Sequence, residues 1–171
     1  MYNIHTMIIV KQSGHLIFKN LVFKCAFGVN GIGLKKIEGD KITPVGKYSL
    51  LKVYYRSDRI KNLKTKLKKI IIKKNMGWCD DPKSELYNKE IRTPNIFNYE
   101  KLYRKDKIYD LIVVLNYNSK PVIKNKGSAI FIHIAKQKFK STEGCIALKR
   151  NDLIKLLSLI EKNEKIRIEG S

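Results

Sequence analysis

A run of five apolar residues, Leu111 to Leu115, constrains the fold more than any other feature of the chain. A strand with one face in water alternates apolar and polar residues, so an unbroken run is typical of a strand covered on both faces. We therefore expect a central strand here. The chain has 171 residues, 43% of them hydrophobic, which is enough for a single domain spanning residues 1–171 with one substantial core.

Other segments predict further strands. Segments that are rich in Ile, Val and Phe, or that alternate apolar and polar residues, lie at residues 6–11, 15–19, 21–27, 47–55, 129–134 and 165–169. Turn residues separate several of them, such as Ser13-Gly14 and the turn predicted at Thr43-Pro44-Val45-Gly46. These segments predict a mostly β fold.

Helices are expected in few places. Apolar residues recur with helical spacing near the C-terminus, after a cap predicted at or beside Asn151: Leu153, Ile154, Leu156, Leu157 and Ile160. Residues 98–104 predict a second short helix. The very basic segment 56–74 fits both a helical stripe and, at Ile70-Ile71-Ile72, a strand, so its structure stays open. The expected fold class is mostly β, with one or two short helices.

The segment 127–148 carries the residues that indicate chemistry. His133 lies near the end of a predicted strand, and Cys145 follows Gly144 twelve residues later. An imidazole beside a thiol can take its proton and lower its pKa, and the resulting thiolate is a nucleophile. The alternative is a core histidine and a small buried cysteine without catalytic function.

The cysteines and histidines give no sign of a disulfide framework or a metal site. Cys25, Cys79 and Cys145 are odd in number and far apart, no Cys-x-x-Cys pair occurs, and no two histidines lie within one helical turn. We expect no metal.

The charge indicates a general attraction to polyanions. The formal net charge is +21, from 36 Lys and Arg against 15 Asp and Glu. The basic residues are spread along the chain, and no aromatic residues interleave with the lysines of the segment 56–74 after Tyr55. The sequence therefore predicts no specific nucleic-acid partner. It also shows no apolar run of about 18 residues that could cross a membrane, and no secretory signal at residues 1–5.

A second group of residues is a candidate for binding. Residues 77–82, which we expect to form a loop, contain the only tryptophan, Trp78, and Tyr87 and Asn88 follow shortly after. Loops that gather such side chains often line clefts. The alternative is a tryptophan packed over the edge of the core.

These residues together resemble the L,D-transpeptidase catalytic domain, also called the YkuD domain. The family pattern is a histidine on a strand, a spacer, and then Ser/Thr-His-Gly-Cys. His133, Thr142, Gly144 and Cys145 match it, and Thr43-Pro44-Val45-Gly46 resembles the family's Thr-Pro-x-Gly element. Two residues depart from the pattern: Glu143 replaces the motif histidine, and Ala147 stands where many members have arginine.

The resemblance implies a β-sandwich-like domain that acts on peptidoglycan stem peptides in the cell envelope or periplasm, without a cofactor. Cys145 would be the nucleophile and His133 the base, oriented by a backbone carbonyl near Ile134. The backbone N–H groups of Cys145 and Gly144 would bind the oxyanion. Substrate contacts are expected from Trp78, Tyr87, Asn88, Thr142 and Glu143.

Two other functions remain open at this point. The same fold could use water in place of an amine, which would make the protein an L,D-carboxypeptidase or endopeptidase of peptidoglycan peptides. A protein of another class, a basic polyanion-binding module with a structural Cys145, would need no chemistry at all. The sequence leaves the oligomeric state undetermined.

Overall fold

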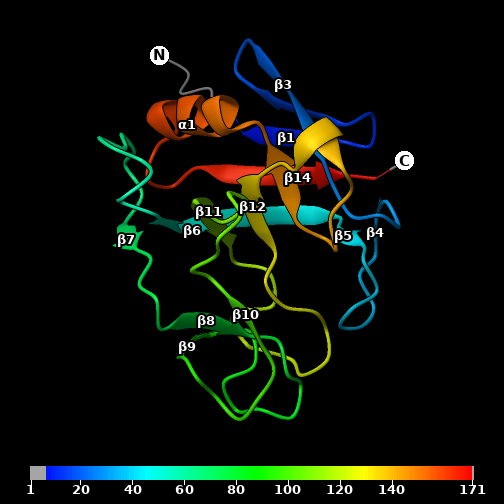
Figure 1. Cartoon of the computed structure of the whole chain (residues 1–171). Helices are drawn as coiled ribbons and strands as arrows, with labels where there is room; N and C mark the ends of the chain where they lie inside the picture. Colours follow the sequence, from blue (N-terminus) through cyan, green and yellow to red (C-terminus); the bar gives the residue numbers. More distant parts are fainter. Residues whose placement is uncertain (1–6, 171) are drawn as a thin grey trace.

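The computed structural model of the protein describes residues 7–170, so residues 1–5 and the predicted strand start at Thr6 lie outside the described part (Figure 1). Its main feature is a nine-stranded sheet in the order β11-β12-β13-β3-β2-β1-β14-β6-β7. The strands are β1 (Ile8–Lys11), β2 (His15–Phe18), β3 (Leu21–Ala26), β6 (Gly46–Tyr55), β7 (Lys69–Ile71), β11 (Leu111–Leu115), β12 (Phe131–Ile134), β13 (Ile146–Leu148) and β14 (Lys165–Glu169).

The long strand β6 closes this sheet on itself. Its first residues pair with β14 and its later residues with β11, which is the first strand in the order, so hydrogen bonds run in a closed ring. Closure leaves few unpaired strand edges. All five residues of β11 are buried, as the apolar run predicts. The predicted mostly β fold is confirmed.

Helix α1 (Arg150–Leu159) covers one end of the sheet and buries Leu153, Leu156 and Leu157 in the core (Figure 1). Its N-cap is Lys149, and no side chain caps it, so the cap predicted near Asn151 is wrong. Among residues 7–170 no helix is long and apolar enough to span a bilayer. The other helical element in the described part of the chain is a 3-10 turn, η1 (Gln137–Phe139).

A small three-stranded sheet lies at the opposite end from α1, in the order β10-β8-β9 (Figure 1). It consists of β8 (Met76–Cys79), β9 (Glu90–Arg92) and β10 (Tyr99–Lys101). The prediction of a loop at residues 77–82 is therefore wrong for residues 77–79, and the prediction of a helix at residues 98–104 is wrong. Pairing on both edges and burial of all four β8 residues hold the segment extended.

Two other segments are extended or irregular, and the first of them was open between helix and strand in the sequence. Residues 56–74 contain the strand β7 but no helix, because Ile60, Leu63 and Leu67 insert into the core from irregular backbone. The Thr43-Pro44 part of the predicted turn pairs as β5 (Thr43–Pro44) with β4 (Ile32–Gly33) in parallel.

Two apolar clusters meet at β12. Ile132 and Ile134 point into the larger cluster, which fills the closed sheet. Because side chains alternate along a strand, Phe131 and His133 face the other way. Phe131 belongs to the second cluster, between the large and small sheets, with Trp78 and Tyr109.

Candidate active site

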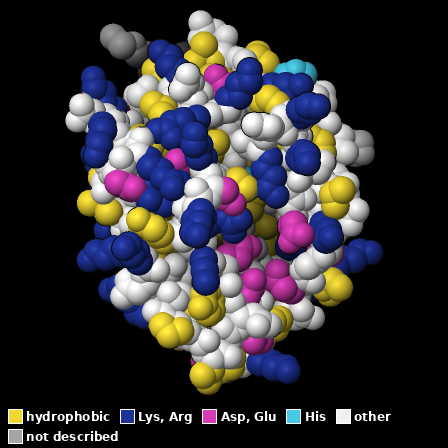
Figure 2. Space-filling model, viewed as in Figure 1, with side chains coloured by type: hydrophobic (Ala, Val, Ile, Leu, Met, Phe, Trp, Pro, Cys, Tyr) yellow, Lys and Arg dark blue, Asp and Glu magenta, His cyan; other side chains and the backbone are white. Residues whose placement is uncertain are grey.

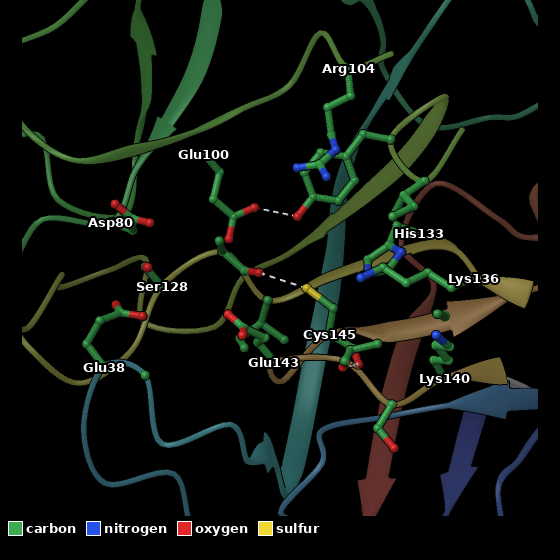
Figure 3. A pocket seen from close by; sticks show the side chains of 18 of the residues that line it. Glu38, Asp80, Glu100, Arg104, Ser128, His133, Lys136, Lys140, Glu143 and Cys145 are labelled. Carbon is green, nitrogen blue, oxygen red and sulfur yellow. Dashed lines mark hydrogen bonds between the residues drawn. The ribbon is translucent and has the colours of Figure 1, made fainter. Parts of the chain in front are cut away.

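The register of two neighbouring strands brings His133 and Cys145 to one face. β12 and β13 run parallel, with His133 opposite Ala147. Cys145 directly precedes β13 and lies two positions before Ala147, so alternation directs both side chains to the same side of the sheet. His133, Cys145 and Ala147 all line a cavity of about 500 Å³ (Figure 3). The pairing of the two strands thus brings together two residues that lie twelve positions apart in the sequence.

The Cys145 thiol is half-buried and held by backbone groups. Its Sγ–H donates to the Ala129 carbonyl at 3.1 Å, and the sulfur accepts the Phe131 N–H at 3.4 Å. Both partners come from the strand region that carries His133. The two catalytic candidates, which both lie within the described residues, form no hydrogen bond with each other.

Burial keeps both groups neutral in this state. It raises the pKa of the Cys145 thiol to about 12, and the negative charge of Glu100 adds to the rise. Burial also lowers the pKa of His133 to about 4. The expected lowering of the thiol pKa by the imidazole is therefore wrong for this state, because desolvation outweighs any attraction between the charged forms.

A backbone carbonyl orients the histidine, as the resemblance implied. His133 Nδ1 lies 3.0 Å from the Ile134 carbonyl oxygen, which can only accept, so Nδ1 carries the proton and Nε2 is left as the base. The Tyr109 ring packs edge-on against the imidazole, with 5.4 Å between ring centroids. These contacts fix both the tautomer and the plane of the ring.

The turn before Cys145 requires glycine. Gly144 has a φ of 131°, and a Cβ there would lie 3.0 Å from the Ile42 carbonyl oxygen. Its carbonyl accepts a hydrogen bond from the Thr43 hydroxyl at 2.8 Å. Thr43 belongs to the Thr-Pro-Val-Gly element, which thereby supports the nucleophile turn.

Thr142 closes the same turn with its hydroxyl. Thr142 Oγ1 donates to the Cys145 carbonyl at 2.6 Å and accepts the Gly144 N–H at 3.1 Å. The Gly144 N–H is therefore engaged, which contradicts its expected availability for an oxyanion. The Cys145 N–H makes no hydrogen bond with any described residue and is the available donor of the two.

Of the five expected substrate-binding residues, only two line the cavity. Thr142 does so, with its hydroxyl engaged as above, and Glu143 lies at the rim. The Glu143 side chain is 85% exposed and 3.9 Å from the Lys41 ammonium, which is a weak surface pair.

Trp78, Tyr87 and Asn88 are buried and are not among the cavity-lining residues, so the prediction that they line the cleft is wrong. The Asn88 carbonyl oxygen accepts the Trp78 indole N–H and the Ala129 N–H, both at 3.0 Å. Asn88 Nδ2 donates to the carbonyls of Tyr117 and Asn118. Asn88 thus holds the backbone of Ala129, which lines the cavity, without reaching the cavity itself.

The cavity also contains acidic residues that no motif indicated. Acidic side chains gather around the hollow in this face, whereas basic ones are scattered (Figure 2). Four of the 15 acidic residues line it: Glu38, Asp80, Glu100 and Glu143. They come from loops and from the short strand β10, so only the folded chain brings them together.

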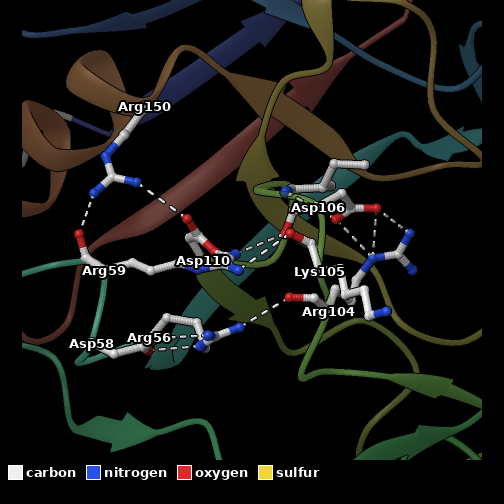
Figure 4. Close-up of polar contacts among 9 residues, drawn as sticks. Arg56, Asp58, Arg59, Arg104, Lys105, Asp106, Asp110 and Arg150 are labelled. Atoms are coloured by element: carbon white, nitrogen blue, oxygen red, sulfur yellow. Dashed lines mark hydrogen bonds and ion pairs between the residues drawn. The ribbon is translucent and has the colours of Figure 1, made fainter.

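A buried ion cluster anchors the segment that carries Tyr109 (Figure 4). Asp110, 1% exposed, accepts from Arg59 at 2.7 Å and from Arg150 at 3.2 Å. Because Asp110 directly follows Tyr109, these contacts fix one end of the cavity wall. Among residues 7–170 no group of three His, Cys, Asp or Glu side chains is arranged to hold a metal ion.

The fold and the site define a closed β-sheet protein in which a histidine on one strand and a cysteine directly before the neighbouring parallel strand form a Cys/His pair. The chain belongs to the YkuD family, the L,D-transpeptidase catalytic domain, whose model matches residues 3–168. The chain matches no curated protein in sequence.

Solved structures share the fold. The helical cell shape determining protein Pgp2 of Campylobacter jejuni (K307A mutant) matches at 18% identity and a TM-score of 0.55, over 97% of this chain and 47% of that one. Bd1075 of Bdellovibrio bacteriovorus matches at 15% identity and 0.50, over 96% and 48%. An avibactam carbamoyl enzyme of Ldtfm matches at 12% identity and 0.50, over 98% and 49%. The chain spans about half the length of these proteins.

Proposed function

We propose that the protein is a peptidoglycan L,D-transpeptidase of the cell envelope that joins stem peptides through a thioester on Cys145. The observation that carries this proposal is that Cys145 and His133, which match the nucleophile and the histidine of the family motif, line one cavity. The family to which the chain belongs supports the choice of substrate.

In the first step the Cys145 sulfur attacks a stem-peptide carbonyl. A C–S bond forms, the C–N bond breaks, and the thiol proton moves by way of His133 Nε2 to the leaving amine. Because both groups start neutral, the proton moves as the bond forms, and the Sγ–H must turn away from the Ala129 carbonyl. The Cys145 N–H is the proposed donor to the oxyanion.

In the second step an amine of another stem peptide resolves the thioester. A new C–N bond forms, the C–S bond breaks, and an amine proton returns to the sulfur through His133. Neither step changes an oxidation state, so no oxidant or reductant is needed. Thr142, Gly144 and Thr43 act as positioning residues, since their hydrogen bonds shape the turn that presents the nucleophile.

Incubation with purified peptidoglycan, followed by mass analysis of the released muropeptides, tests the proposal. We expect new cross-linked dimers with the wild-type protein and none with Cys145→Ala, whose melting temperature serves as the folding control. Trimmed monomers without dimers would assign the chain to carboxypeptidase activity instead. Products from Cys145→Ala at the wild-type level would exclude a cysteine nucleophile.

A further inference from the structure

A row of basic side chains crosses neighbouring strands on the outer face of the large sheet. Lys11 on β1 lies opposite His15 on β2, and His15 lies opposite Lys24 on β3. Lys149 directly follows β13, which pairs antiparallel with β3, so the register places it beside Lys24. All four side chains are exposed, because the alternate residues of each strand point into the core. With strands about 4.8 Å apart, these four residues, here called the basic row, extend over about 14 Å.

The basic row lacks counter-charges. Lys11, Lys24 and Lys149 have no ion-pair partner among residues 7–170. Glu169 lies opposite Lys11 on β14, but its carboxylate pairs with the Arg167 guanidinium at 4.0 Å. Like charges on neighbouring strands repel each other and destabilise a sheet. A polyanion that lies along the row would remove this repulsion.

Phe139 connects the basic row with the active-site cavity. The ammonium groups of Lys24 and Lys149 lie 4.9 and 6.0 Å from the centre of its ring, and cation–π attraction holds the ring at the end of the row. Phe139 belongs to the loop that contains η1, and Lys136 and Lys140 of the same loop line the cavity (Figure 3). The positive charge of the row therefore extends to the rim of the cavity.

Positive and negative charges occupy different parts of the surface. Figure 2 shows acidic side chains around the hollow and mainly basic ones over the upper part of the molecule. Figure 1, drawn from the same side, places β1 and β3 in that upper part. A polymer with many negative charges is therefore attracted to the basic row. The cavity is left free for the single stem peptide that reacts in the proposed function.

The apolar residues beside the row favour a hydrophilic polymer over a membrane. Ile9 and Ile17 lie opposite each other next to the row and are half-buried in the sheet surface. Val22, opposite Ile17, is 62% exposed. Binding in a bilayer interface requires an apolar face that enters the lipid. Two half-buried isoleucines among long lysine side chains do not provide such a face.

We propose that the basic row binds the carboxylates of polymeric peptidoglycan, outside the catalytic cavity. Stem peptides that end in free carboxylates repeat along each glycan strand, so the polymer is a polyanion. Release of counterions and multiple attachment make such binding strong for a polymer and weak for a single peptide. This inference rests on the proposed function, which makes peptidoglycan the substrate. It adds a second site that holds the polymer while one stem peptide reacts.

Cosedimentation with purified peptidoglycan sacculi tests the proposal. The sacculi are first stripped of phosphodiester-linked polymers with acid, so that carboxylates are the anionic groups that remain. A second portion is coupled to ethanolamine, which converts those carboxylates into neutral amides. The fraction of protein bound is measured over a series of salt concentrations, and the melting temperature of each variant serves as the folding control.

The triple variant Lys11→Gln/Lys24→Gln/Lys149→Gln should bind stripped sacculi at least about tenfold more weakly than the wild type, and its binding should depend less on salt. Conversion of the carboxylates into amides should weaken the binding of the wild type to a similar extent. The matched control is Lys64→Gln/Lys68→Gln/Lys74→Gln, which removes the same charge from exposed lysines near β7. It should bind within about twofold of the wild type.

Equal losses in the two triple variants, or undiminished binding to the amidated sacculi, would overturn the proposal. Stronger binding to vesicles of phosphatidylglycerol and phosphatidylcholine than to stripped sacculi would assign this face to a membrane and would overturn it as well. The binding assay needs no turnover. Failure of the protein to form an acyl-enzyme with a soluble donor peptide would therefore contradict the proposed function and leave the result for the basic row unchanged.

Discussion

The protonation of His133 should lower the free energy of unfolding as the pH falls. Burial lowers its folded-state pKa to about 4, from 6.5 in an unfolded chain. Between these values the unfolded state binds a proton that the folded state does not, so acid favours unfolding. The gap of about 2.5 pH units corresponds to about 3 kcal/mol, lost as the pH falls from above 6.5 to about 4.

The perturbation is His133→Asn, which keeps a donor for the Ile134 carbonyl and removes the titration. The assay is urea unfolding at several pH values between 7 and 4, followed by the fluorescence of Trp78, the only tryptophan. We expect the free energy of unfolding to fall by about 3 kcal/mol less in the variant than in the wild type over this range. Carboxylates contribute equally to both proteins and cancel in the comparison.

His15, which is exposed on β2, provides the matched control. His15→Asn is taken through the same urea unfolding series as a control for the loss of a surface histidine. Parallel curves for the wild type and His133→Asn would refute the reasoning, because a histidine that charges freely in the folded protein cannot be buried as described.

Three further predictions follow from the site. Asn88→Ala should lower the free energy of unfolding by about 3 kcal/mol, measured by urea unfolding, because two buried and two partly buried hydrogen bonds lose a partner. A change below about 0.5 kcal/mol, the usual effect of a surface substitution, would contradict this. Gly144→Ala should abolish muropeptide products and lower the melting temperature, because a Cβ at positive φ meets the Ile42 carbonyl. Wild-type activity in this variant would show that the turn does not require glycine. The rate at which iodoacetamide alkylates Cys145, followed by peptide mass analysis, should rise about tenfold per pH unit, because the pKa of the thiol is raised to about 12. A rate that stops rising near pH 8.5 would show that the thiol pKa is not raised.

Much of the fold was predictable because local patterns of apolar and polar residues determine several of its strands and its helix. The apolar run of β11, the alternation in β14 and the helical repeat of α1 each reflect one burial pattern, and each element forms where its pattern lies. Residues 77–79 and 99–101 were assigned wrongly because pairing with neighbouring strands, which is not local, keeps them extended.

The candidate site was predictable only where residues match a motif. His133, Gly144 and Cys145 are close in sequence and lie on β12 and in the turn directly before β13, so the resemblance could identify them. Asp80 and Glu100 reach the cavity from separate parts of the small sheet, and no spacing in the sequence signals that meeting. The same reason explains the wrong prediction for the tryptophan region, since burial behind the cavity depends on contacts made across the fold.

Capture of the acyl-enzyme tests the central claim most directly. The wild-type protein is mixed with a donor stem peptide in the absence of acceptor, quenched in acid within seconds and analysed as intact protein and as peptides. The account predicts a mass increase equal to the donor acyl group, located on Cys145 and absent from Cys145→Ala. An adduct on another residue, or full product formation by Cys145→Ala without any adduct, would contradict it.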